Sequence, residues 1–293
     1  MKIICGWLHT FYDHGYAASF EDTLSGITKT AEWGFKDFEM EGIYEDNLRI
    51  MYERRNELKE HIEKAGLNLR CFIPMLPDLG NPDQDRRAKA LELFDLGAEL
   101  GSWLGAEVLM MTSYEAPVEY IGESPGDDPV HYGKQYHIRV SDSFDWERSW
   151  ENLVTVTKRC ARIADKWELR LTMETRAGDS VSNTDGFLRL SEAVDDPNFG
   201  MAFDTAHLHA QKEILPLSVE KLRDRIFYIH ASDNDSRTNE HLEIGKGTID
   251  WVSLFQALRK HGFDGYVTLD IGDCPDPKGA YQRSRDYLET LTY

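Results

Sequence analysis

Short apolar runs and longer amphipathic stretches alternate along the whole chain. Eight such runs lie at about 2–8, 35–41, 67–73, 106–111, 169–174, 199–204, 226–231 and 265–271. Short apolar runs bounded by turn residues are typical of buried parallel strands. Eight strands alternating with helices predict an α/β fold, a single (β/α)8 barrel over residues 1–293, with a long loop at about 113–145 after the fourth strand.

Capping residues mark where several predicted helices begin and end. The side chain of Ser19 can accept a hydrogen bond from the amide three residues on, and Gly34 can end the helix that starts there. A charged helix is predicted at about 46–64, and another begins at Pro82. Asn183 predicts the start of a helix that runs to about 194.

Four of the apolar runs end in side chains that can bind a metal ion, namely Glu174, Asp204, His230 and Asp270. In a parallel α/β barrel, the groups that do chemistry lie at the carboxyl ends of the strands. Three carboxylates around one point need an opposite charge, which a divalent cation supplies. Three oxygen donors and one nitrogen donor suit Mn²⁺ first, with Mg²⁺, Co²⁺ or Zn²⁺ as alternatives. The other interpretation is a set of solvated strand-end acids, with Asp204 as a turn or cap residue.

The ends of the first two predicted strands offer further candidates to line a pocket, namely Trp7, His9 and Glu41. Glu39 and Glu41 share one face of the second strand, because strand side chains alternate. A barrel interior can hold acids only near its mouth, so Glu41, at the strand tip, is the better site candidate. Core packing is the alternative for Trp7.

Composition narrows the class of protein. The chain has 52 acidic and 33 basic residues and a formal charge of −19, which disfavours binding to nucleic acid and to anionic membranes. No apolar stretch approaches the roughly 20 residues that cross a bilayer. The apolar start at residues 1–5 is too short for a signal peptide. The four cysteines form no C-x-x-C pair, so neither a zinc ribbon nor a thioredoxin-type site is indicated. A cytoplasmic protein is therefore expected.

Motifs in the second half of the chain carry a family resemblance. The sequence D-T-A-H closes the sixth strand at 204–207, H-A-S-D closes the seventh at 230–233, and H-L-E-I-G-K-G-T-I-D-W follows at 241–251. In their order and placement these motifs resemble the xylose isomerase-like TIM barrel superfamily, which contains sugar isomerases and epimerases, inosose dehydratases and AP endonucleases. The resemblance implies a metal bound by Glu174, Asp204, His230 and Asp270.

The resemblance also implies roles for individual residues. Glu174 would bind the metal and act as the base, Arg176 would clamp a carbonyl or hydroxyl oxygen, and His207 would bind substrate or polarise its carbonyl. The alternatives are a surface salt bridge for Arg176 and a supporting hydrogen bond for His207. In the epimerase branch the acid after strand eight is a catalytic glutamate. Asp270 is one methylene shorter, so it is expected as a ligand and candidate catalytic group, and its role as a second base is open.

The long loop at about 113–145 contains His131 and His137 beside several tyrosines. Long loops on the active face of a barrel are often functional. Histidine is the usual acid or base near neutral pH. His137 is therefore a candidate catalytic group and His131 a candidate substrate contact. A solvent-exposed or partner-binding loop is the alternative.

The leading hypothesis is a divalent-metal-dependent isomerase or epimerase that removes a proton next to the carbonyl of a sugar or keto-sugar. The second is a metal-dependent lyase or dehydratase on a keto-sugar or 3-keto-glycoside, similar to enzymes that cleave C-glycosides, often with a small partner subunit. A DNA-repair nuclease is disfavoured by the negative charge and by the shortage of histidines for a trinuclear zinc cluster. A non-catalytic sugar-binding barrel, a homo-oligomer and a small partner subunit stay open.

Overall fold

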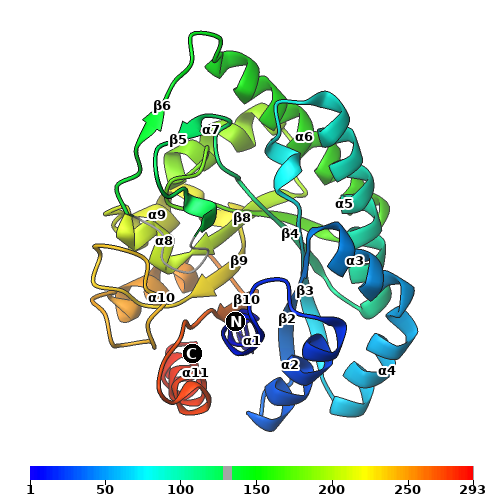
Figure 1. Ribbon diagram of the computed structural model, residues 1–293. Helices are drawn as coiled ribbons and strands as arrows, with labels where there is room; N and C mark the ends of the chain where they lie inside the picture. Colours follow the sequence, from blue (N-terminus) through cyan, green and yellow to red (C-terminus); the bar gives the residue numbers. More distant parts are fainter. Residues whose placement is uncertain (128–133, 293) are drawn as a thin grey trace.

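Eight parallel strands close into a barrel in the computed structural model, which describes residues 1–127 and 134–292. Neighbouring strands follow the order β1-β10-β9-β8-β7-β4-β3-β2, and β2 returns to β1 (Figure 1). The barrel strands are β1 (Lys2–Cys5), β2 (Asp37–Ile43), β3 (Asn68–Met75), β4 (Val108–Thr112), β7 (Arg170–Glu174), β8 (Phe199–Asp204), β9 (Ile226–Ala231) and β10 (Tyr266–Leu269). The predicted (β/α)8 barrel is confirmed.

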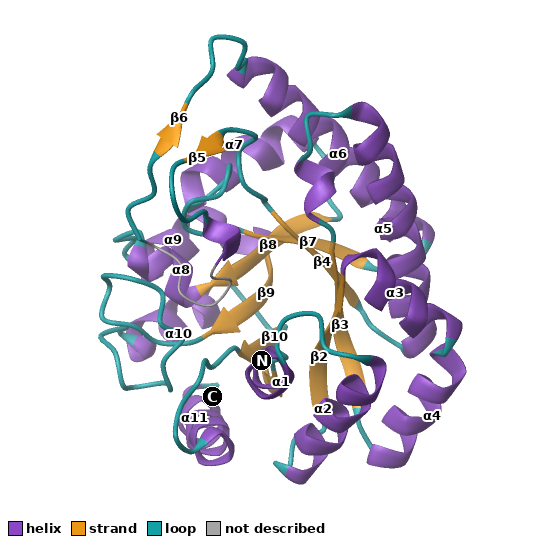
Figure 2. Cartoon of the chain, in the orientation of Figure 1, coloured by secondary structure: helices purple, strands orange, loops and turns teal. Residues whose placement is uncertain are grey.

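Helices surround the strands on the outside of the barrel (Figure 2). They are α1 (Leu8–His14), α2 (Phe20–Glu32), α3 (Tyr44–Glu53), α4 (Arg55–Ala65), α5 (Gln84–Leu104), α6 (Trp146–Lys166), α7 (Thr184–Val194), α8 (Thr205–Ala210), α9 (Leu215–Leu222), α10 (Trp251–Lys260) and α11 (Pro277–Leu291). Short 3-10 turns form η1 (Pro77–Gly80), η2 (Pro125–Asp127) and η3 (Arg223–Arg225). Among the described residues, none of the helices has the length and apolar character needed to cross a membrane.

The predicted caps form, but one predicted helix is divided. Ser19 and Asp22 make a reciprocal capping box at the start of α2, and Asn183 accepts the amide of Gly186 at the start of α7. The helix predicted at about 46–64 is instead the pair α3 and α4, which meet at Arg54. The Arg54 guanidinium lies 3.8 Å from the centre of the Phe20 ring and bonds to acids of α2 and α4.

The first strand ends earlier than the apolar run predicts. The run at 2–8 is a strand only to Cys5, and Trp7 then begins α1. Between them the Gly6 amide donates to the carbonyl of Leu269 at 2.9 Å, and a Cβ at this position would stand 2.3 Å from that same oxygen. Only glycine allows this close approach. The chain therefore turns across the barrel mouth, which brings α1 there.

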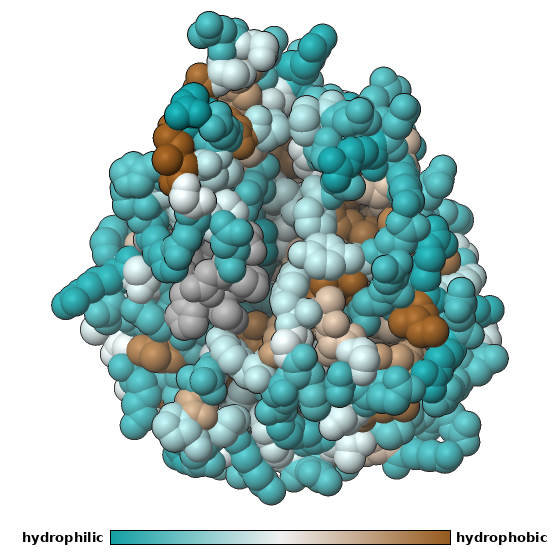
Figure 3. Space-filling model, in the orientation of Figure 1, coloured by the Kyte–Doolittle hydropathy of each residue, from teal (hydrophilic) through white to brown (hydrophobic). Residues whose placement is uncertain are grey.

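The long segment after β4 forms a small antiparallel ribbon of its own. Its strands are β5 (Glu119–Tyr120) and β6 (Ile138–Arg139), drawn at the upper left of Figure 1. Apolar side chains gather on it and appear brown in the same part of Figure 3; Ile121, Ile138 and Val140 are each about half exposed. His131 lies in the gap of the described chain, outside the described residues.

Strand alternation places the polar strand ends on the inner face of the barrel. Asp204 of β8 stands opposite His230 of β9 in register, and His230 in turn stands opposite Thr268 of β10. Glu174 ends β7 and pairs in register with Ala202 of β8. The four predicted metal-binding side chains thus come from neighbouring strands at one end of the barrel.

Candidate active site at the barrel mouth

A cavity of about 140 Å³ opens at the carboxyl ends of the strands. Its polar lining residues, which we call the polar half, are Glu41, Thr112, Glu174, Arg176, His207, His230, His241 and Asp270. Its apolar half is made of Leu8, Phe11, Tyr12, Tyr16, Ile73, Met75 and Met110. A largely apolar cavity with a few convergent polar groups is the usual form of a small-molecule site.

His230 lies at the centre of the polar half, between two carboxylates. Its Nδ1 is 2.6 Å from Oε1 of Glu174, and its Nε2 is 2.8 Å from Oε2 of Glu39. Burial alone lowers the pKa of this imidazole, but the charges and hydrogen bonds of Glu39 and Glu174 outweigh burial and raise it well above the ordinary value. Without a metal ion, the imidazolium of His230 balances the charge of these buried acids.

Asp204 is a buried acid, and only one of its two carboxylate oxygens accepts a hydrogen bond in the described part of the chain. Its Oδ1 accepts the backbone amide of His207 at 2.7 Å and so begins α8. Within the described part of the chain its Oδ2 has no hydrogen-bond partner, although the side chain is fully buried. Burial, followed by the charge of Glu174, raises the pKa of Asp204. A buried acceptor without a partner is costly, and a bound cation would remove that cost.

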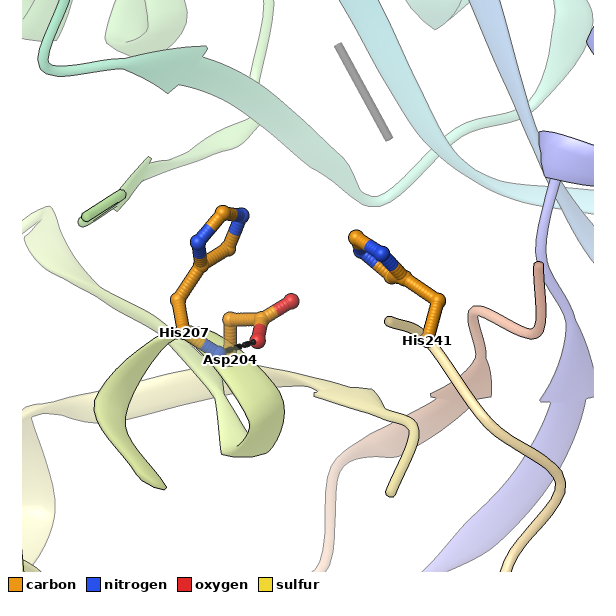
Figure 4. A group of neighbouring side chains, drawn as sticks. All are labelled: Asp204, His207 and His241. Atoms are coloured by element: carbon orange, nitrogen blue, oxygen red, sulfur yellow. Dashed lines mark hydrogen bonds between the residues drawn. The ribbon is translucent and has the colours of Figure 1, made fainter. Parts of the chain in front are cut away.

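Two groups of metal-ligand type share this aspartate. In each, the ligand atoms lie within 4.8 Å of one another: Glu174, Asp204 and His230 form one group, and Asp204, His207 and His241 form the other. Figure 4 shows the second group, with the two imidazole rings on either side of the Asp204 carboxylate. The first group contains three of the four side chains predicted as metal ligands.

Asp270, the fourth predicted ligand, faces a different partner. It belongs to neither group among the described residues, and its Oδ2 lies 3.3 Å from Nε2 of His241. It nevertheless lines the same cavity. The structure therefore brings Asp270 to the site without joining it to the other three, and its role as a ligand stays a prediction.

Arg176 and His207 line the cavity and are held by protein contacts. The Nε of Arg176 donates to Oδ2 of Asp179 at 3.0 Å, and this pair is buried rather than on the surface. The amide of Ala177 donates to Nδ1 of His207 at 3.3 Å. Burial holds the pKa of His207 well below its ordinary value. A neutral imidazole that accepts at Nδ1 carries its proton on Nε2, so His207 is a hydrogen-bond donor.

The remaining predicted site residues have different positions. Glu41 is half-buried in the cavity wall, and burial together with the charges of Glu39 and Asp270 raises its pKa well above the usual range. His9 is buried behind the cavity, where its Nε2 lies 3.1 Å from the Thr30 hydroxyl and its ring packs against Trp33. His137 is exposed next to β6 and is not among the residues that line the cavity.

Two ionisable residues of the site were not among the predicted ones, Glu39 and His241. Glu39 shares the inward face of β2 with Glu41, and this alternation was the signal that could have identified it. His241 opens the H-L-E-I-G-K-G stretch of the sequence. The carboxylate of Asp233 fixes that loop by accepting from the amides of Gly245 and Ile249 and from Nε1 of Trp251.

The comparisons with known proteins agree with this fold. A model of the xylose isomerase-like TIM barrel family matches residues 27–291. The chain is 23% identical to an inosose dehydratase of Lacticaseibacillus casei, over 64% of this chain and 65% of that protein. It is 22% identical to a probable ketose 3-epimerase of Synechocystis sp., over 81% of this chain and 74% of that protein. The structure of 3-keto-D-glucoside 4-epimerase from E. coli superposes with a TM-score of 0.75 at 19% identity, covering 99% of both chains.

Because the family model covers most of the sequence, the chain belongs to the xylose isomerase-like TIM barrel family. The chain spans about half to two thirds of the length of the first curated relatives that it matches.

Proposed function

We propose that this barrel is a divalent-metal-dependent enzyme that removes a proton next to the carbonyl of a sugar or keto-sugar, giving an isomerase or epimerase. The observation that carries the proposal is the buried Oδ2 of Asp204, which has no hydrogen-bond partner in the described chain and lies beside Glu174 and His230. The named relatives include a probable ketose 3-epimerase and a 3-keto-D-glucoside 4-epimerase, which supports a sugar as the substrate.

The side chains that would hold the metal are Glu174, Asp204 and His230, with Asp270 as a fourth ligand. Their chemistry fits a divalent ion, because three carboxylates and one imidazole suit Mn²⁺ foremost and Mg²⁺, Co²⁺ or Zn²⁺ next. When bound, such an ion polarises a carbonyl oxygen and offsets the negative charge that develops on it. Glu39 bonds to Nε2 of His230, so it would orient the ring with Nδ1 toward Glu174 and Asp204.

Glu174 is the proposed base. Burial raises the pKa of this carboxyl, but the charge of His230 and a hydrogen bond from it outweigh burial and lower the pKa. A ligating His230 would be neutral, and the bound cation would then take over its role of keeping Glu174 ionised. As a carboxylate, Glu174 can accept a proton from a sugar carbon in the cavity. The Nε2–H of His207 and the guanidinium of Arg176, held by Asp179, would donate to substrate oxygens and orient the ring. Reprotonation at the neighbouring carbon would give the isomer, and reprotonation at the same carbon from the opposite face would give the epimer.

A second candidate reaction, dehydration or another elimination from a keto-sugar, is favoured by one specific contact. Elimination needs an acid on the leaving group, and the His241–Asp270 pair lies in the cavity wall with its nearest atoms 3.3 Å apart. An aspartate rather than a glutamate after β10 also favours this reaction, as does the similarity to an inosose dehydratase. His137 and His131, the acids expected from the sequence, stay predictions.

The test combines metal analysis with product identification. We expect the purified protein to contain a divalent metal by elemental mass spectrometry. We also expect it to convert at least one sugar from a panel of ketoses, inososes and 3-keto-glucosides in D₂O. An isomerase or epimerase yields a rearranged sugar with deuterium at the reacting carbon, whereas a dehydratase yields a dehydrated product, and NMR separates the two. Absence of exchange and of product with every sugar, whether Mn²⁺, Mg²⁺, Co²⁺ or Zn²⁺ is added, would contradict the proposal.

A further inference from the structure

A second cavity of about 300 Å³ adjoins the first at the barrel mouth. Both cavities are lined by Tyr16, Met75 and Arg176. These shared residues make the second cavity an outer continuation of the first. We call the two the inner and outer cavities. A substrate whose reacting ring lies beside Glu174 therefore has room for further atoms in the outer cavity.

Aromatic rings run from the inner cavity into the outer one. The ring of Tyr16 lies 5.2 Å from that of Phe11, which lines the inner cavity, and 5.9 Å from that of Tyr44, which lines the outer one. Tyr16 and Tyr44 are 37% and 48% exposed, and their rings adjoin, so they present a continuous aromatic surface. Tyr44 also has a φ of 59°, in the left-handed region that non-glycine residues rarely occupy. Exposed aromatic faces suit the apolar C–H face of a sugar ring.

The polar atoms of the outer cavity suit hydroxyl groups rather than an anion. Asp78, Asn81 and Glu115 line it, and the Asn81 amide donates to Oδ1 of Asp78 at 2.9 Å. Among the described residues that line the two cavities, Arg176 is the only arginine or lysine, and it forms an ion pair with Asp179. Asp78 is already paired with Arg86 at 2.9 Å, and Arg86 is not among the described residues that line the two cavities, so a phosphorylated sugar would meet no arginine or lysine there besides Arg176. A neutral ring with hydroxyl groups fits both the acids and the aromatic wall.

From this arrangement we propose that the outer cavity binds the second sugar ring of a neutral glycoside, while the ring that reacts occupies the inner cavity. The inference rests on the proposed function and names its substrate class, a keto-glycoside with at least two sugar rings rather than a free ketose or a sugar phosphate. Tyr44 is then a specificity-determining residue, because it contacts the second ring and lies away from the reacting one.

Binding measured without turnover tests the outer cavity by itself. Titration calorimetry of the full chain with Mn²⁺ present would compare glucose with maltose, cellobiose, trehalose and sucrose. We expect at least one disaccharide to bind about fivefold or more tightly than glucose, as an added ring contact predicts. That advantage should be lost in Tyr44→Ala and largely kept in Tyr44→Phe. The matched control is Tyr287→Ala, because Tyr287 is 41% exposed on α11 and lines neither cavity.

Each outcome bears on the proposal. If no disaccharide binds more tightly than glucose, or if Tyr44→Ala keeps the advantage, the outer cavity does not bind a second sugar ring. Phenyl glucoside would be included, since a gain for it without a gain for any disaccharide would assign the cavity to an aryl group and overturn the sugar-ring assignment. Failure of the proposed chemistry is distinguishable: a disaccharide advantage that depends on Tyr44, without proton exchange on any keto-sugar, would keep the subsite and reject the reaction.

Discussion

The two halves of the barrel mouth are built by different means. The polar half comes mainly from the ends of β7, β8 and β9, from α8 and from the segments after β9 and β10. The apolar half comes from α1, the residues just after it, and the ends of β3 and β4. The polar half supplies the ionisable groups that proton transfer and metal binding need, while the apolar half offers the surface that recognises substrate shape.

Because the two halves differ in this way, mutations in them should affect different kinetic constants. Changes in the polar half should lower kcat, because they remove interactions that matter in the transition state. Changes in the apolar half should raise KM and leave kcat nearly unchanged, because they remove binding that is equal in the ground and transition states. The variants below run from the largest expected effect on activity to the smallest.

Glu174→Gln should have the largest effect. The amide oxygen can still bind a cation, so metal content should be mostly retained, but an amide is a very poor proton acceptor. We expect kcat to fall by about 10²–10⁴-fold, the usual contribution of a general base. Steady-state kinetics and elemental analysis measure both quantities. The exposed Glu192 on α7 provides the control, Glu192→Gln. Near-wild-type turnover of Glu174→Gln would show that another group takes the proton.

Glu39→Gln tests a residue that acts through His230. The carboxylate of Glu39 bonds to Nε2 of the ring, so its neutral amide should weaken metal binding by about 10–100-fold without touching substrate. Activity should fall at low Mn²⁺ and recover when Mn²⁺ is in excess. Glu41→Gln is the matched control, because Glu41 is on the same face of β2 but not bonded to His230. An equal loss of Mn²⁺ affinity in both variants would reject a specific role for Glu39.

Asp270→Asn tests whether Asp270 acts as a metal ligand or takes part in proton transfer with His241. If Asp270 is only a ligand, activity should fall about tenfold or more, as when a partner of a metal site is lost, and excess Mn²⁺ should restore much of it. If it acts with His241 in proton transfer, excess metal should not restore activity, and His241→Asn should show a similar loss. Activity measured against Mn²⁺ concentration for the two variants separates these results. Unchanged activity in Asp270→Asn would exclude both roles.

Phe11→Ala should act on the apolar half alone. Phe11 lines the inner cavity and packs against Tyr16, so its removal takes apolar contact from the substrate without touching the ionisable groups. We expect KM to rise by about three- to tenfold, with kcat within about twofold of the wild type. Phe11→Leu, which keeps apolar volume, should show a smaller rise. If kcat of Phe11→Ala fell as far as that of Glu39→Gln at low Mn²⁺, the assignment of kcat to the polar half and of KM to the apolar half would be wrong.

Most ionisable residues of the polar half could be predicted from the sequence, but their hydrogen-bond partners could not. Glu174, Asp204, His230 and Asp270 each follow an apolar run, so strand alternation and barrel closure are enough to bring them to one face. Their partners cannot be read from a local pattern. Glu39 bonds to a histidine 191 positions away, and that pairing depends on how the closed barrel fills its interior.

The apolar half was missed because its main element, α1, was not predicted: the strand predicted at 2–8 overlaps α1 only at Leu8. Apart from Lys2, the residues at 2–8 carry no polar side chain, and a short apolar run does not distinguish a strand from the start of a helix. What decides is Gly6, whose close contact with the Leu269 carbonyl ends β1 and lets α1 begin. The aromatic residues of α1 then reach the cavity wall, and His9 turns to the back of it.

His9 gives the last test, because the sequence placed it at the substrate and the structure places it in the packing behind α1. Burial lowers the pKa of His9 to about 3, so the folded protein holds the ring neutral. The unfolded chain binds a proton near pH 6.5. Between about pH 6.5 and 3 the unfolded state therefore binds more protons, and this stabilisation, fully present above pH 6.5, is lost as the pH falls.

His9→Phe keeps a ring beside Trp33 and removes the titration, and Thr30 still donates to the Gly26 carbonyl. Near pH 7 its activity should match the wild type. At pH 4 the variant should gain on the order of 3 kcal/mol of folding stability over the wild type, compared with the difference between the two at pH 7. Urea unfolding at pH 7 and pH 4 measures this difference, with His137→Phe as an exposed control. A large loss of kcat in His9→Phe, together with an unchanged dependence of folding stability on pH, would instead show that His9 takes part in catalysis. It would also mean that α1 contributes to the chemistry as well as to recognition.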